Sequence, residues 1–150
     1  MSTSFLQLYD LFLKTNQDDK FLKTLTLEQQ EDILETFLLT AIMDFDSSRT
    51  DLSYDLSAKA FVNVLSLDEQ RILTMYMRLY WIQRLLYDEK NLRNQMGDRD
   101  YRRYSPANQL KALSELEVTL ESQIKKRIYR YKNKVTLNNH KTPTDVSGRG

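Results

Sequence analysis

The 150-residue sequence contains no cysteine, three glycines, two prolines and one histidine. Without cysteine the chain has no disulfide framework, no thiolate nucleophile and no zinc knuckle, which agrees with assembly in a reducing compartment. The only histidine, His140, lies in a polar C-terminal segment, so one chain cannot supply a Ser-His-Asp site or a two-histidine metal motif. No pair of carboxylates stands out as a general acid and general base for catalysis. We therefore expect no enzymatic activity, no cofactor and no metal site.

Long apolar runs are also missing. The longest nearly apolar run, Phe37 to Met43, is far shorter than the roughly 20 residues that a membrane-spanning helix needs. Asp10 stands where a signal peptide would keep its apolar stretch uncharged. The sequence therefore predicts a soluble protein that is not secreted.

The scarcity of glycine and proline predicts an all-α fold, because turn-rich β structure needs such residues between its strands. Three of the four expected helices open with a capping box, at Ser4, Thr26 and Ser66. The expected helices cover Phe5 to Asn16, Thr26 to about Phe45, Leu67 to Met96 and Ser105 to about Lys132.

The segment between the second and third helices is polar. Asp46 to Asp55 predicts a loop, and Ala58 to Leu65 predicts a short helix or turn. The oxygen side chains from Asp44 onward match several spacings of an EF-hand calcium loop. The match fails because Arg49 stands where that loop needs glycine and Asp55 replaces its bidentate glutamate. We therefore expect a solvated acidic loop.

The third helix is apolar nearly all round and is expected to end at Gly97 as a C-cap. A helix that is apolar on every side needs cover on every side, either from the other helices of the chain or from another subunit. Trp81, the sole tryptophan, is expected in the core because its neighbours are apolar.

The fourth helix is expected to start with Ser105 as N-cap and Pro106 at the first helical position. Beyond Lys134 the sequence loses its periodicity, which predicts an extended or disordered arm. The predicted fold is a small helical bundle (residues 1–134) with one long central helix, a long C-terminal amphipathic helix and an extended C-terminal arm (residues 135–150). The apolar stripe of the fourth helix consists of Leu110, Leu113, Leu116, Leu120, Ile124, Ile128 and Tyr131.

The net charge of +1 hides a polarised chain. Residues 1–70 carry 13 acidic and 5 basic side chains, a net of −8, whereas residues 71–150 carry 8 acidic and 17 basic ones, a net of +9. This asymmetry predicts that the second half meets nucleic acid, an acidic protein surface or the acidic half of a neighbouring copy. The candidate channel or acidic-partner contacts are Lys125, Lys126, Arg127, Arg130, Lys132 and Lys134.

Two tyrosines interrupt this basic run, Tyr129 and Tyr131. Bases mixed with aromatic residues can contact phosphates and stack on exposed nucleobases. The alternatives are a solvated helix face or a protein contact, since Tyr131 also continues the apolar stripe.

Several motifs lie between Leu67 and Lys134. They are Leu67-Asp-Glu-Gln-Arg-Ile-Leu73 leading to Trp81, the turn Gln95-Met-Gly97, the helix opening Tyr104-Ser-Pro-Ala-Asn108-Gln-Leu-Lys-Ala-Leu113 and the basic Arg127-Ile-Tyr-Arg-Tyr131. In these motifs the segment resembles the head-to-tail connector proteins of tailed bacteriophages, also called adaptor, neck or head-completion proteins. The residues expected to fix the helix opening are Tyr104, Ser105, Pro106, Asn108 and Leu110.

The resemblance implies a structural virion protein that forms a ring, commonly of twelve copies, beneath the portal protein. Such a ring extends the DNA channel, contacts other neck or tail proteins, and lies in the virion neck after assembly in the host cytoplasm. In that family a C-terminal arm reaches onto the portal. The arm residues expected to contact the portal or a neighbouring subunit are Val135, Leu137, His140, Pro143 and Val146.

Two other functions stay open. The first is a small helical nucleic-acid-binding or regulatory protein that uses the basic end of its last helix. The second is a phage-encoded chaperone or inhibitor that masks a host protein.

Overall fold

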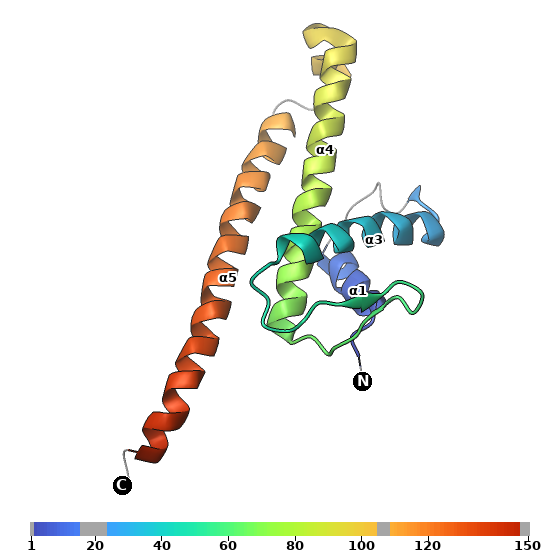
Figure 1. Ribbon diagram of the computed structural model, residues 1–150. Helices are drawn as coiled ribbons and strands as arrows, with labels where there is room; N and C mark the ends of the chain where they lie inside the picture. The colour runs from blue at the N-terminus through green and yellow to red at the C-terminus, as the bar shows by residue number, and fades with distance from the viewer. Residues whose placement is uncertain (1, 16–23, 105–108, 148–150) are drawn as a thin grey trace.

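In the computed structural model of the protein, the described residues are 2–15, 24–104 and 109–147. They form a mostly helical bundle around one long helix, as the sequence predicted, together with a small two-stranded sheet (Figure 1). In chain order the elements are α1 (Phe5–Thr15), α3 (Leu27–Asp44), β1 (Tyr54–Asp55), β2 (Ala60–Phe61), α4 (Leu67–Tyr104) and α5 (Gln109–Ser147).

The first two helices begin where their capping boxes predicted. At the start of α1, Gln7 Oε1 accepts a hydrogen bond from the Ser4 N–H at 3.0 Å, and Ser4 Oγ accepts one from the Gln7 N–H at 3.4 Å. Thr26 and Gln29 make the same reciprocal pair at the start of α3. The predicted buried face of α1 is confirmed, and it consists of Phe5, Leu8, Tyr9 and Phe12.

A β-hairpin spans Tyr54 to Phe61 and begins inside the predicted loop. The region from Ala58 to Leu65 was predicted as a short helix or turn, and it holds the end of the hairpin turn and strand β2 rather than a helix. Strands β1 and β2 pair antiparallel, with Tyr54 opposite Phe61. The backbone of Thr3 accepts a hydrogen bond from the Phe61 N–H at 2.8 Å, and the Phe61 ring packs edge-on against Phe5. Each strand has only two residues, so the sequence shows no alternating pattern, and the contacts with Thr3 and Phe5 come from a distant segment.

Helix α4 lies at the centre of the bundle, with α1, α3 and α5 packed against it (Figure 1). Trp81 is 1% exposed and packs edge-on against Phe37 of α3, which confirms its place in the core. The helices of the chain itself therefore cover much of α4, and contact with another subunit stays a prediction. Its buried apolar side chains are Ile72, Leu73, Met77, Leu79, Trp81, Ile82 and Leu86.

Helical geometry in α4 is interrupted at Gly97, where the sequence predicted the end of the helix. Its backbone has φ 76° and ψ 161°, a conformation that glycine adopts because it has no Cβ. A further helical segment follows as far as Tyr104.

Helix α5 carries the predicted apolar stripe toward α4. Leu120, Ile124 and Tyr131 are buried, and the other members of the stripe are partly buried. The predicted end near Lys132 was wrong, because the helix continues to Ser147. The backbone of residues 135–147 is therefore helical rather than an extended arm, since adding a turn to an existing helix costs far less than starting one.

Candidate functional site

Glu69 joins the acidic loop to the start of α4. Its buried carboxylate accepts a hydrogen bond from the Ser66 N–H at 2.8 Å, which completes the third predicted capping box. It also accepts hydrogen bonds from the Thr50 hydroxyl at 2.8 Å and the Thr50 N–H at 3.1 Å. Burial by itself raises the pKa of Glu69, but these hydrogen bonds, with one from Tyr131, outweigh burial and hold the pKa below its ordinary value. The carboxylate is therefore ionised and fully engaged in structure.

Tyr131 holds the basic end of α5 against this junction. Its hydroxyl donates to Glu69 Oε2 at 2.8 Å and accepts a hydrogen bond from the Arg49 N–H at 2.7 Å. Its ring packs edge-on against Phe45, with 5.7 Å between ring centroids. Of the two tyrosines in the basic run, Tyr131 thus belongs to the core, whereas Tyr129 is 68% exposed.

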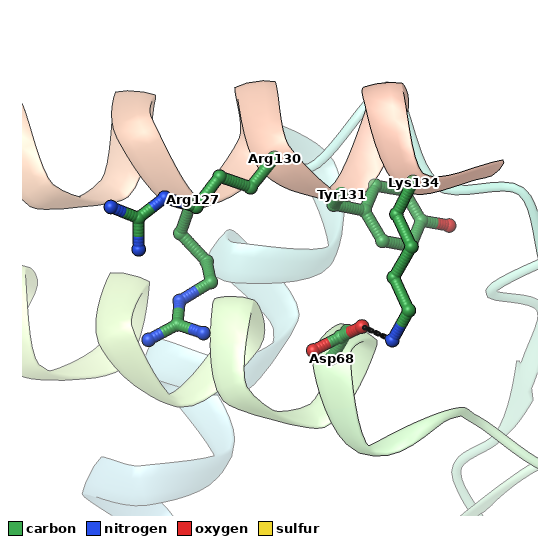
Figure 2. Close-up of a pocket in the computed structure, with 5 residues that line it drawn as sticks. All are labelled: Asp68, Arg127, Arg130, Tyr131 and Lys134. Atoms are coloured by element: carbon green, nitrogen blue, oxygen red, sulfur yellow. Dashed lines mark hydrogen bonds and ion pairs between the residues drawn. The ribbon is translucent and has the colours of Figure 1, made fainter. Parts of the chain in front are cut away.

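The six predicted basic contacts lie on α5, and three of them, Arg127, Arg130 and Lys134, line a pocket with Asp68 at the start of α4. Arg127 is half-buried, and the other five are exposed. Lys134 pairs with Asp68 of α4, with 3.3 Å between Nζ and Oδ2. Figure 2 shows the side chains of Arg127 and Lys134 extending from α5 toward α4. The structure therefore places the basic run beside a second helix rather than on an isolated helix end.

A groove follows the seam between α4 and α5. Three adjoining pockets of about 160, 340 and 250 Å³ form it, and Arg127 lines all three (the first is drawn in Figure 2). Among the residues that the structure describes, Asp68 is the one acidic residue in their lining. We call this feature the arginine groove and define it by its cationic side chains, which are Arg71, Arg78, Lys126, Arg127, Arg130 and Lys134.

Sequence reasoning missed the two arginines that α4 contributes to this groove, Arg71 and Arg78. Their spacing of seven residues places both on one face of a helix, and this signal could have been matched to the basic run of α5. Arg78 Nε is buried and has no hydrogen-bond partner among the described residues. A buried donor without an acceptor is unusual in folded proteins.

The other predicted contacts are only partly described. Ser105, Pro106 and Asn108 lie outside the described residues, Tyr104 ends α4, and Leu110 is half-buried in the first turn of α5. The predicted portal or subunit contacts lie near the C-terminal end of α5, where the structure describes the helical backbone but not the side chains. They are Val135, Leu137, His140, Pro143 and Val146.

The acidic loop uses its carboxylates locally. Asp51 accepts hydrogen bonds from the N–H and the hydroxyl of Ser53 at 3.0 and 2.7 Å, and Asp55 accepts one from the Ser57 N–H at 2.9 Å. Within residues 2–15, 24–104 and 109–147, no group of three or more His, Cys, Asp or Glu side chains is arranged to hold a metal ion. In the same ranges, no helix has the length and apolar character needed to cross a bilayer.

A comparison of the chain with protein-family models, curated proteins and solved structures finds no match. The functional assignment therefore depends on the residues and their geometry.

Proposed function

We propose that this protein is a structural head-tail connector of a tailed-phage virion. It forms a homo-oligomeric ring beneath the portal protein, extends the DNA channel and meets other neck or tail proteins. It performs this role without enzymatic activity or a cofactor.

The observation that carries the proposal is the separation of charge across α4. The arginine groove lies between α4 and α5, and the start of α3, which is acidic, projects on the other side of α4 (Figure 1). Each subunit of a closed ring presents two different surfaces to its neighbours, and these surfaces must be complementary. A basic surface and an acidic surface on one subunit meet this requirement.

Exposed apolar side chains on the two long helices add to this support. Tyr87 of α4 and Val118 of α5 are each 65% exposed. Single exposed apolar residues are common on monomers, but they also supply contact area when charged surfaces meet. In the proposed ring we assign Tyr87 and Val118 to contacts with the other neck or tail proteins, outside the contact between copies.

The C-terminal end of α5 provides the portal contact in this proposal. Helix α5 continues thirteen residues beyond Lys134, the last residue with a described contact to α4. A helical end that extends past its neighbour is available to a partner protein. The basic residues upstream then lie near the DNA channel or an acidic partner.

Co-purification with the portal protein of the same phage tests the proposal. The expected result is that the chain is retained on tagged portal rings and adds a ring of density beneath them in electron micrographs. Failure to bind portal rings at low ionic strength, with the chain folded by circular dichroism, contradicts the proposal.

One observation favours a second candidate function, nucleic-acid binding. Tyr129 is exposed between Lys126 and Arg130, so its ring could stack on an unpaired base while the cations contact phosphates. This function predicts that Tyr129→Ala weakens binding to single-stranded DNA. It also predicts that affinity falls steeply with salt, because neutralised phosphates release counterions.

A further inference from the structure

We infer that the arginine groove is a docking site for carboxylates at the start of α3 in a second copy of this chain. This inference rests on the proposed homo-oligomeric function and deepens it, because it assigns the residues that meet between neighbouring subunits. The three carboxylates are those of Glu28, Glu31 and Asp32.

The groove lacks internal partners for its arginines. Arg71, Arg78 and Arg127 make no ion pair with any described residue, and Arg78 Nε is also buried without an acceptor. A guanidinium without an intrachain partner gains charge-assisted hydrogen bonds when a carboxylate enters the groove. Guanidinium groups fit carboxylates through two parallel hydrogen bonds, so this cluster suits an acidic partner.

The lining of the groove favours carboxylates over nucleic acid. Met75 and Leu120 give it an apolar floor. Tyr131 is the one aromatic residue among the described lining residues, and its buried ring and engaged hydroxyl leave no face for a base. Sequence-tolerant binding of single strands depends on such stacking faces. Tyr129, the exposed tyrosine, does not line the groove.

The acidic surface has the matching properties. Glu28, Glu31 and Asp32 are exposed, and none of them makes an ion pair in the part of the chain that the structure describes. Their spacing of three and four residues places them on one side of α3. Burial raises the pKa of Tyr9, and the charges of Glu35, Glu31 and Asp32 raise it further, which agrees with a concentrated negative field on this part of α3.

The dimensions and positions are also compatible. At a rise of 1.5 Å per residue, the acidic turn from Glu28 to Asp32 is about 6 Å long, and the arginines from Arg71 to Arg78 span about 10 Å. The start of α3 and helix α5 lie on opposite sides of α4 (Figure 1). One copy therefore offers its acidic turn to the groove of the next, which is a head-to-tail contact.

A charge-reversal experiment with two double variants tests this contact. The groove variant is Arg71→Glu with Arg127→Glu, and the α3 variant is Glu31→Arg with Asp32→Arg. Each variant alone places like charges opposite each other, whereas a mixture of the two restores opposite charges. The matched control reverses two exposed cations elsewhere on α4, Arg84→Glu with Lys90→Glu.

Sedimentation velocity at low ionic strength measures the result, with circular dichroism as the check on folding. We expect each variant alone to lose self-association by about tenfold or more relative to wild type. The equimolar mixture should recover it, and the control should resemble wild type. Loss in the groove variant without recovery in the mixture overturns the inference.

Disulfide trapping gives a second readout, because the chain has no native cysteine. Mixing the Gln123→Cys variant with the Asp32→Cys variant should give a cross-linked dimer under mild oxidation. In the control mixture the Val118→Cys variant takes the place of Gln123→Cys. Val118 is exposed but lies outside the groove lining, so this mixture should give much less cross-linked dimer. No cross-link and no association of wild type overturns the inference.

The remaining outcomes separate this inference from the proposed function. A ring on the portal that tolerates both charge reversals overturns the groove contact and leaves the connector function standing. Specific contact between copies without any binding to portal supports the groove contact and contradicts the connector function. If the groove variant instead loses binding to a duplex or single-stranded oligonucleotide while copies still associate, the groove belongs to nucleic acid and the inference is wrong.

Discussion

The Tyr131 hydroxyl of α5 donates a hydrogen bond to the buried Glu69 carboxylate of α4 at 2.8 Å. The same hydroxyl accepts the Arg49 N–H at 2.7 Å, and the same carboxylate caps the start of α4. One pair of residues thus fixes the position of α5 relative to α4 and to the acidic loop. The basic side chains of the groove depend on this arrangement, because they lie on both helices.

Replacing Tyr131 with Phe should destabilise the fold. The substitution keeps the ring but leaves the Arg49 N–H without its acceptor and removes one donor from Glu69, at a cost of about 1–3 kcal/mol. Urea unfolding followed by circular dichroism measures the change. Tyr129→Phe on the exposed side of α5 is the matched control and should stay within about 0.5 kcal/mol of wild type. Equal effects of the two substitutions would contradict the role assigned to Tyr131.

Replacing Glu69 with Gln should lower stability at neutral pH and change its dependence on acid. The pKa of folded Glu69 lies below the ordinary value of 4.5, so the folded state favours the ionised form. Its contribution is complete above that ordinary value and is lost as pH falls through the folded pKa. The difference in unfolding free energy between wild type and Glu69→Gln should therefore be largest near pH 7 and shrink below about pH 4.5.

Denaturant titrations of both proteins across the acid range give this difference directly. Shared acid-sensitive groups, such as the exposed Asp51, remain in both proteins and cancel. A difference that stays constant from pH 7 to the acid limit of folding would show that the Glu69 charge does not contribute.

Truncating the apolar stripe of α5 should weaken its packing on α4. Leu120 is 2% exposed, so Leu120→Ala should cost about 2–5 kcal/mol through lost burial and a residual cavity. Val118 lies two residues earlier and is 65% exposed, so Val118→Ala should cost less than about 1 kcal/mol. Thermal and chemical unfolding compare the two, and a Val118→Ala effect as large as that of Leu120→Ala would contradict the observed face of α5.

Deleting residues 135–150 should separate folding from attachment. The described contacts of α5 with the body end at Lys134, so the shortened chain should lose only the helical signal of the deleted residues and keep the unfolding midpoint of the body. Retention on tagged portal rings should fall, because the deletion removes the proposed portal contacts. Unchanged retention would count against any role of this segment in attachment.

Local signals made much of the fold predictable. Capping residues such as Thr26 and Ser66 act on the N–H groups three residues ahead, so sequence alone located the starts of α1, α3 and α4. The β-hairpin was missed because each strand has only two residues, too few to show an alternating pattern, and because its support by the Thr3 backbone comes from a distant segment. The end of α5 was also misplaced, because helix propagation does not require an apolar stripe.

The candidate site was predictable only in part. The basic run of α5 was evident from composition, but the groove needs Arg71 and Arg78 from α4, and only the packing of the two helices shows that they face it. Likewise, the capping role of Glu69 was local, whereas its bond to Tyr131 joins residues 62 positions apart. Interactions between distant segments are the part that pattern reasoning cannot supply.

Electron microscopy of virions that encode this protein tests the central claim most directly. The account predicts a ring of this chain between the portal and the tail, with the α5 end toward the portal and opposite charges meeting between neighbouring subunits. Absence of the chain from purified, intact particles would contradict it.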